Sequence, residues 1–207
     1  MARSKSSGRW LKEHFDDAFV KRAQLEGWRS RAAFKLSEIQ EKYCLMRAGM
    51  VIVDLGAAPG GWSQCAAKAV GQGGRVIALD VLEMEPVDGV EFICGDFTED
   101  APLAELESAL AGDGVDLVLS DMAPNMSGMG LIDQPKAMYL AELALDFARD
   151  RLKPGGAFVV KMFQGTGSDA FLVACRESFG KVMVRKPKAS RPRSREVYVV
   201  GQHRELD

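Results

Sequence analysis

The sequence predicts a doubly wound α/β fold with a mostly parallel, seven-stranded sheet and helices on both faces. Two observations support this prediction. Short apolar segments alternate with segments of helical periodicity from residue 48 onward. The final two strand-like segments then follow each other without a helical segment between them, which indicates antiparallel pairing at an edge of the sheet.

Seven segments are predicted as strands because they are short, apolar and rich in β-branched residues. In chain order they are residues 50–54, 75–80, 90–94, 115–120, 157–163, 181–186 and 196–200. Helical periodicity predicts the intervening helices, at residues 61–70, 101–110, 135–152 and 169–179. The link at residues 187–195 lacks this periodicity and is shorter than most parallel crossovers, so the last two strands are expected to form a hairpin.

Residues 1–47 lie outside the alternating pattern and are predicted to form a basic segment of one or two helices. We expect this segment to belong to the same domain as residues 48–207, because the length suits one domain and 47% of the chain is hydrophobic. No apolar run is long enough to span a membrane, and the polar first residues lack the apolar stretch of a signal peptide. The protein is therefore expected to be cytoplasmic.

Basic residues concentrate at the two ends of the chain, although the net charge is −2. Residues 1–47 hold eleven Lys and Arg against six Asp and Glu, and residues 181–195 hold seven Lys and Arg and no acid. The first of these regions also carries aromatic side chains suited to base stacking, at Trp10, Phe15, Phe19 and Trp28. The pattern favours a nucleic-acid partner, with a merely solvated charged surface as the alternative.

Metal and thiol chemistry have little support in the sequence. The chain has two histidines, at His14 and His203, and no C-x-x-C pair. A His/Cys metal site is therefore not expected. We expect reduced, inert thiols at the four widely spaced cysteines, which are Cys44, Cys65, Cys94 and Cys175.

A turn of small residues follows the first predicted strand, at residues 54–62, and reads Asp-Leu-Gly-Ala-Ala-Pro-Gly-Gly-Trp. Gly56, Gly60 and Gly61 allow the backbone to approach a ligand closely. The turn is not the G-x-G-x-x-G fingerprint, and Pro59 lacks the backbone donor that a pyrophosphate needs. A nucleoside-bearing ligand without phosphates is thus favoured over a dinucleotide.

Acidic residues end four successive strands of the predicted sheet, at Asp54, Asp80, Asp96 and Asp121. Ligands of doubly wound sheets bind at the carboxyl ends of the strands. Any one of these acids is equally well explained as a helix cap or turn residue. However, Asp80 lies where an acid accepts hydrogen bonds from ribose hydroxyls, and Asp96 is placed to accept from an adenine amino group. The four acids together predict a pocket for S-adenosylmethionine.

Several segments carry a resemblance to a known family. They read Arg-Ser-Arg-Ala-Ala-Phe-Lys-Leu at 29–36, Val-Asp-Leu-Gly-Ala-Ala-Pro-Gly-Gly-Trp-Ser-Gln at 53–64, Ser-Asp-Met-Ala-Pro-Asn-Met-Ser-Gly at 120–128, Phe-Val-Val-Lys at 158–161 and Ser-Arg-Glu-Val-Tyr at 194–198. Over nearly its whole length the chain resembles the bacterial FtsJ family of ribosomal RNA 2′-O-ribose methyltransferases. The resemblance implies a Rossmann-like class I methyltransferase that uses S-adenosylmethionine and no metal.

The resemblance also implies which residues form the site. The family uses a Lys-Asp-Lys-Glu tetrad, and the matching positions here are Lys35, Asp121, Lys161 and Glu196. The predicted cofactor-binding residues are Asp54, Gly56, Gly60, Gly61, Trp62, Asp80, Asp96 and Asp121. RNA contacts are expected at Arg29, Arg31, Arg191, Arg193 and Arg195.

The chemistry of ribose methylation suits this tetrad. A 2′-hydroxyl is a poor nucleophile near neutral pH, so the site must align it and accept its proton. A lysine accepts a proton only when burial or a nearby cation lowers its pKa. Lys161, in a buried strand, is the predicted proton acceptor, with Lys35 as second cation and Asp121 as the orienting anion. Glu196 is expected to fix Lys35 or the ribose, and a purely structural Lys161–Asp121 ion pair is the alternative.

Other functions fit the sequence less well. Asn125 replaces the aromatic residue of the Asp-Pro-Pro-Tyr loop in amino-methyltransferases. Carbon-5 pyrimidine methylation needs a cysteine nucleophile, and Cys94 alone lies near the acids. The glycine pattern argues against a dehydrogenase, and the tetrad against a non-catalytic RNA-binding module. The resemblance implies a monomer acting on a uridine ribose in the A loop of the assembled large ribosomal subunit; another RNA, such as a tRNA or cap, is the alternative.

Overall fold

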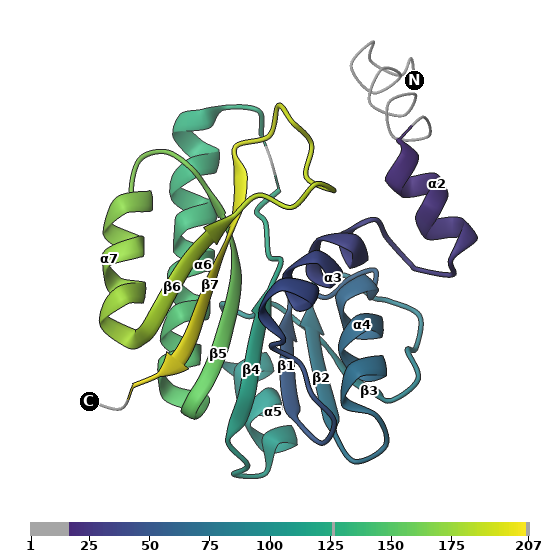
Figure 1. Ribbon diagram of the computed structural model, residues 1–207. Coiled ribbons are helices and arrows are strands. Elements are labelled where there is room, and N and C mark those ends of the chain that lie inside the picture. Colours follow the sequence, from purple (N-terminus) through teal and green to yellow (C-terminus); the bar gives the residue numbers. More distant parts are fainter. Residues whose placement is uncertain (1–16, 126, 206–207) are drawn as a thin grey trace.

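The computed structural model describes residues 17–125 and 127–205. Its core is one seven-stranded sheet with the order β3-β2-β1-β4-β5-β7-β6 (Figure 1). The strands are β1 (Val51–Leu55), β2 (Arg75–Asp80), β3 (Val90–Cys94), β4 (Val115–Ser120), β5 (Leu152–Phe163), β6 (Phe179–Arg185) and β7 (Glu196–Arg204). The helices are α2 (Ala18–Leu25), α3 (Ala32–Tyr43), α4 (Gly61–Val70), α5 (Asp100–Leu110), α6 (Gly130–Arg151) and α7 (Ser168–Ser178).

Strands β1 to β5 pair in parallel, and β7 lies antiparallel between β5 and β6. The predicted mostly parallel sheet with a carboxyl-terminal antiparallel hairpin is confirmed. Because β7 enters the sheet at the end where β5 leaves it, Phe163 pairs with Glu196 and Lys161 pairs with Tyr198. The first residues of β7 thus lie at the edge of the sheet where the parallel strands end.

Two hydrophobic layers cover the faces of the sheet, as alternating strand residues require. On β1, Ile52 belongs to the hydrophobic cluster that includes residues of α3 and α4, whereas Val53 belongs to the cluster that includes residues of α5, α6 and α7. Both side chains are fully buried. Helices on both faces of the sheet were predicted and are confirmed.

Two elements, β5 and α6, begin five residues earlier than the sequence predicts. β5 starts at Leu152, which pairs with Val115, but regular pairing resumes only at Ala157 after a bulge. The Lys-Pro-Gly-Gly segment inside this bulge interrupts the apolar pattern, so the sequence signals only the regular part. Helix α6 starts at Gly130, because the buried carboxylate of Asp133 holds the preceding turn and Pro135 falls inside the helix.

The amino-terminal helix α2 is tied to the core and to the loop between β6 and β7. Asp17 caps α2 by accepting a hydrogen bond from Phe19 N at 2.9 Å, and it also pairs with Arg31. Arg31 donates to the carbonyl of Ala189, which packs with Phe34 in a small cluster. Residues 1–16, which include the predicted stacking residues Trp10 and Phe15, lie outside the described residues. Across the described ranges, no helix has the length and apolarity needed to cross a membrane.

Candidate active site

The four tetrad residues meet at the edge of the sheet where β4 and β5 end. Lys161 Nζ lies 3.1 Å from Asp121 Oδ1 and also donates to the Asp121 carbonyl. Lys35 Nζ, from α3, lies 2.7 Å from Glu196 Oε1 at the start of β7. The sequence prediction that Asp121 holds Lys161 thus agrees with the geometry, and Glu196 contacts Lys35. The site contains two ammonium–carboxylate pairs drawn from four elements.

Tyr198 joins these two pairs and has no role in the sequence prediction. Its hydroxyl accepts a hydrogen bond from Lys35 Nζ at 2.9 Å and donates to Asp121 Oδ1 at 2.8 Å. The side chain is fully buried and its ring packs against Trp62, with centroids 5.5 Å apart. One available signal is its spacing, because residues two apart on a strand point to the same face. Tyr198 therefore shares a face with Glu196.

Burial and neighbouring charges determine the ionisation states of Asp121 and Tyr198 at the centre of this network. Burial alone would raise the pKa of Asp121, but Lys161, Lys35 and the Tyr198 hydroxyl hold that pKa below its ordinary value. Burial raises the pKa of Tyr198 well above its ordinary value, and Asp121 and Glu196 raise it further. Near neutral pH Asp121 is thus an anion and Tyr198 a neutral hydroxyl, so the hydroxyl donates to the carboxylate.

A cavity of about 430 Å³ opens next to Asp121 at the same edge of the sheet. Its walls come from the ends of β2, β3 and β4, and include Asp80, Asp96, Phe97 and Met122. Gly56 also lines it, with a φ of +74°, and a Cβ atom there would lie 2.7 Å from Met122 N. Only glycine permits this close crossing of the two loops.

Asp80 and Asp96 present carboxylates at this cavity while holding its walls. Asp80 Oδ2 accepts from Ala58 N and Asp80 Oδ1 from Leu82 N, each at 2.9 Å. Asp96 Oδ1 accepts from the backbone N and the hydroxyl of Thr98, at 2.9 and 2.8 Å. The two acids thus fix the loops after β2 and β3, and carboxylate oxygens retain further acceptor capacity for a ligand.

Four of the predicted cofactor residues are not among the described residues that line this cavity: Asp54, Gly60, Gly61 and Trp62. Trp62 is buried and donates from Nε1 to the Ala32 carbonyl at 2.8 Å. A Cβ atom on Gly61 would lie 2.5 Å from Ser30 Oγ. Both residues hold α3 against α4, which positions Lys35, and that contact is a role the sequence did not reveal.

Asp54 is fully buried at the end of β1. Its Oδ2 accepts from Ser63 Oγ at 2.6 Å, while Oδ1 has no partner among the described residues. Burial raises the pKa of Asp54 to about 7, against the lowering effect of the Ser63 hydrogen bond, and the charges of Asp121 and Asp80 add to the rise. The carboxyl group is thus poised to change ionisation near neutral pH.

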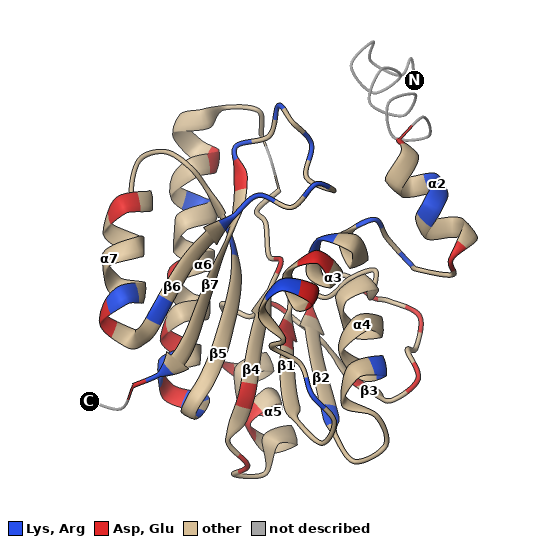
Figure 2. Ribbon diagram, in the orientation of Figure 1, with Lys and Arg blue, Asp and Glu red and all other residues tan. Residues whose placement is uncertain are grey.

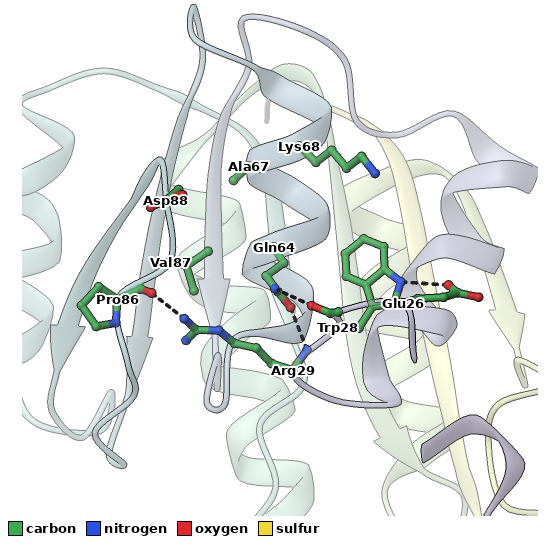
Figure 3. Close-up of a pocket in the computed structure, with 10 residues that line it drawn as sticks. Glu26, Trp28, Arg29, Gln64, Ala67, Lys68, Pro86, Val87 and Asp88 are labelled. Carbon is green, nitrogen blue, oxygen red and sulfur yellow. Dashed lines mark hydrogen bonds between the residues drawn. The ribbon is translucent and has the colours of Figure 1, made fainter. Parts of the chain in front are cut away.

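Arg29 holds loops together beside the cavity, although the sequence suggested an RNA contact. Its guanidinium donates to the carbonyls of Pro59 at 3.3 Å, Pro86 at 2.5 Å and Glu85. Its backbone N donates to Gln64 Oε1 at 2.9 Å (Figure 3). Arg29 therefore links the segment before α3 to the glycine turn and to the loop between β2 and β3.

The loop between β6 and β7, residues 186–195, carries three of the predicted RNA contacts, and the fourth, Arg31, precedes α3 and donates to this loop at the Ala189 carbonyl. Figure 2 shows its basic residues grouped at the edge of the sheet that holds the active site. Arg193 and Arg195 are exposed and Arg191 is half-buried. Lys186 Nζ donates to the carbonyls of Pro192 at 3.1 Å and Ser194 at 2.6 Å, which closes the loop.

Comparison with known proteins identifies the family. The family model for FtsJ-like methyltransferases matches residues 28–204, a span that contains the whole Lys35–Glu196 network. The chain belongs to this family. The predicted resemblance is thereby confirmed.

Two similar proteins carry one name and match nearly the full length of the chain. "Ribosomal RNA large subunit methyltransferase E" of Xanthomonas campestris pv. campestris is 62% identical over 201 residues, covering 97% of this chain and 96% of the relative. The protein of that name from Azoarcus sp. is also 62% identical over 201 residues, covering 97% and 98%. A ribosomal RNA methyltransferase from Plasmodium falciparum has a similar structure, with a TM-score of 0.77, 28% identity, and coverage of 87% of this chain and 100% of that one.

Among residues 17–125 and 127–205, no three His, Cys, Asp or Glu side chains group in a way that could hold a metal ion. Burial raises the pKa of the Cys65 thiol to about 11 and that of Cys175 to about 12, so neither forms the reactive thiolate near neutral pH.

Proposed function

We propose that the protein transfers a methyl group from S-adenosylmethionine to the 2′-hydroxyl of a ribose in large-subunit ribosomal RNA. The observation that carries the proposal is the hydrogen-bonded network from Lys161 through Asp121 and Tyr198 to Lys35 and Glu196, next to the 430 Å³ cavity. Membership of the FtsJ-like methyltransferases supports the reaction class. The names of the 62% identical relatives support the substrate class.

The cavity fits S-adenosylmethionine by size and by chemistry. Its volume lies in the range of small-molecule sites. The carboxylates of Asp80 and Asp96 suit ribose hydroxyls and an amino group, while Phe97 and Met122 supply apolar surface for a base. The unpartnered Asp54 Oδ1 adds a buried acceptor close to the glycine turn. When bound, this cofactor supplies a methyl group already activated by its sulfonium.

In the proposed reaction, Lys161 in its neutral amine form accepts the proton of the ribose hydroxyl. Asp121 orients Lys161 Nζ through both its carboxylate and its backbone carbonyl. Lys35, fixed by Glu196 and Tyr198, supplies the positive charge that stabilises the ribose oxygen as its proton leaves. Alignment and proton acceptance are what this transfer requires of the protein, because the nucleophile is weak.

The test of the proton acceptor is Lys161→Ala, with Lys153→Ala as the matched control. Lys153 lies on the same strand but pairs with Asp116 at 2.9 Å on the exposed, far end of β5. We expect Lys161→Ala to bind S-adenosylmethionine normally and to lose methyl transfer by roughly 10²–10⁴-fold on large subunits from cells lacking the protein. A folded, cofactor-binding Lys161→Ala variant with the wild-type rate would refute the assignment.

The finer target is a uridine in the A loop of the assembled subunit, modified by a cytoplasmic monomer. The tetrad chemistry suits any ribose, so a tRNA or a cap-like RNA is the alternative. Mass mapping of ribose methylation in RNA from cells lacking the protein distinguishes them: loss of one 2′-O-methyl group from the A loop supports the proposal. Loss confined to tRNA or to an RNA end would overturn it.

RNA is proposed to bind the exposed basic residues of the loop at 186–195. Charge reversal at Arg191, Arg193 or Arg195 should weaken RNA binding and reduce its salt dependence without changing affinity for S-adenosylmethionine. Arg151→Glu, on the last turn of α6, is the control because its partner Glu107 lies on α5. Wild-type RNA affinity of the loop variants at low salt would remove this loop from the RNA surface.

A further inference from the structure

The described residues expose eight large hydrophobic side chains, and half of them lie in one short stretch of α6 and the residue before it. These four are Met129, Leu131, Ile132 and Tyr139, with exposed fractions of 62%, 94%, 44% and 52%. Isolated exposed hydrophobic residues are ordinary, but a cluster of this kind marks an interaction surface. We name these four residues the α6 apolar patch.

The patch borders the active site. Leu140, the neighbour of Tyr139, lines the proposed cofactor cavity, as does Asn125 in the loop leading to α6. Gln134 Nε2 donates to the carbonyl of Phe163, the last residue of the strand that carries Lys161, at 2.9 Å and to that of Thr166, just beyond it, at 3.2 Å. The helix that carries the patch therefore contacts both the cavity and the end of the strand that carries Lys161.

The patch also faces the same edge of the sheet as the basic loop at 186–195. Gln164 N donates to the Arg195 carbonyl at 3.0 Å, so the segment that holds Gln134 also contacts this loop. Figure 1 shows the first turns of α6 and the loop between β6 and β7 at one end of the molecule. An apolar surface and a basic surface thus flank the same site.

Hydrogen bonds hold the turn that carries the patch. Asp133, which is buried, accepts from the backbone N and the hydroxyl of Ser127, both at 2.8 Å, and from Gly128 N at 2.9 Å. This carboxylate fixes the turn before α6 from inside. The apolar side chains next to it remain exposed on a braced element, which is how a binding surface is presented.

The distribution of charge around the patch favours RNA as the partner. Between residues 129 and 140 the one exposed charged side chain is Lys136, because Asp133 is buried. Ile132, Lys136 and Tyr139 follow the spacing of one helical face. The basic loop across the site has no acidic residue. Cations attract phosphates, while aliphatic and aromatic side chains stack on or insert between bases.

We propose that the α6 apolar patch is a nucleobase-binding surface that holds the bases next to the methylated ribose, while the basic loop binds phosphates. This inference rests on the proposed function, since it takes RNA as the substrate. It assigns the two sides of the site different roles. The apolar side binds unstacked bases of the RNA, and the basic side binds the phosphates of the RNA backbone.

The two roles differ in salt dependence, and this difference is the test. The double variant Leu131→Ala/Tyr139→Ala should weaken binding to large subunits lacking the modification by roughly 5–100-fold, the range for lost base stacking. The slope of affinity against salt should stay that of the wild type, because no phosphate contact is removed. Tyr139→Phe keeps the ring and should bind normally. Val173→Ala, exposed at 50% on α7, is the control.

Measurements of cofactor affinity and of binding to deproteinised ribosomal RNA complete the test. The proposal requires unchanged affinity for S-adenosylmethionine and weaker binding to the deproteinised RNA. Unchanged RNA binding by the double variant would overturn it, and so would a defect seen only on intact subunits, which would assign the patch to a ribosomal protein. If the wild-type protein binds RNA through the patch but transfers no methyl group, the proposed methyltransferase function is wrong, while the assignment of the patch as a nucleobase-binding surface is supported.

Discussion

Replacing Tyr198 by Phe tests whether its hydroxyl is the link between the two ion pairs. The change removes one hydrogen bond from the Lys35 ammonium at 2.9 Å and one to the Asp121 carboxylate at 2.8 Å, and it keeps the ring that packs on Trp62. Hydrogen bonds to charged groups contribute about 1.5–3 kcal/mol each. Both charges keep a partner, Glu196 for Lys35 and Lys161 for Asp121, so we place the total loss at about 2–4 kcal/mol.

A protein of this size loses about 2–4 °C in Tm per kcal/mol, so thermal unfolding should shift down by roughly 5–15 °C. Methyl transfer, measured well below that Tm, should lose about 10–100-fold in kcat, because Asp121 no longer fixes Lys161 in one orientation. The matched control is Tyr139→Phe, since Tyr139 is half exposed and its change likewise removes one hydroxyl. Wild-type Tm and kcat in Tyr198→Phe would refute the reasoning, as would a loss equal to that of Tyr139→Phe.

Three further predictions concern residues around the network. Asp54→Asn should be more stable than the wild type above pH 7 in the absence of cofactor: the Asp54 pKa is raised to about 7 in the folded state, so the stability it contributes is full below pH 4 and is lost as the pH rises to 7. Urea unfolding at pH 5 and pH 8 measures the difference in free energy of unfolding between the variant and the wild type. This difference should grow with pH towards roughly 4 kcal/mol as an upper bound, and a constant difference would contradict the assignment. Ser190→Ala removes a donor 3.0 Å from Glu196 Oε1 and should lower kcat by a few-fold to 10-fold with unchanged RNA affinity, whereas a change in affinity alone would show that Ser190 acts only through the basic loop. Arg29→Gln should raise the Kd for S-adenosylmethionine about 10-fold, because the loops beside the cavity lose their common donor, and calorimetry with unchanged affinity would rule this out.

The sheet and half of the network follow from the sequence because they depend on local patterns. Asp121 and Lys161 lie at the ends of strands predicted from apolar periodicity, and the carboxyl ends of parallel strands meet at one edge. Glu196 follows from the hairpin, whose start lies at the same edge. These placements need only strand order and direction.

The positions of Lys35, Arg29 and Tyr198 depend on packing between segments that are distant in sequence. The periodicity of apolar residues does not predict such packing. Lys35 reaches the site because Trp62 and Gly61 hold α3 on α4, and the sequence suggested a cofactor role for both of those residues. The charge of Arg29 predicts an RNA contact from the sequence, and the structure adds that its guanidinium donates to the carbonyls of Pro59 and Pro86. The sequence pattern predicts only a strand residue at Tyr198. The role of its hydroxyl depends on the two ion pairs that the fold brings to it.

The insertion of β7 between β5 and β6 has a consequence for synthesis of the protein. During synthesis, Glu196 and Tyr198 emerge from the ribosome after Lys35, Asp121 and Lys161. Until β7 is made, the two lysines therefore lack the Glu196 carboxylate and the bridging hydroxyl of Tyr198. A nascent chain that stops before residue 196 also leaves the edge of β5 unpaired, which exposes it to proteolysis and aggregation. Pairing of the free edge of β5 and completion of the candidate active site therefore both depend on this one last strand.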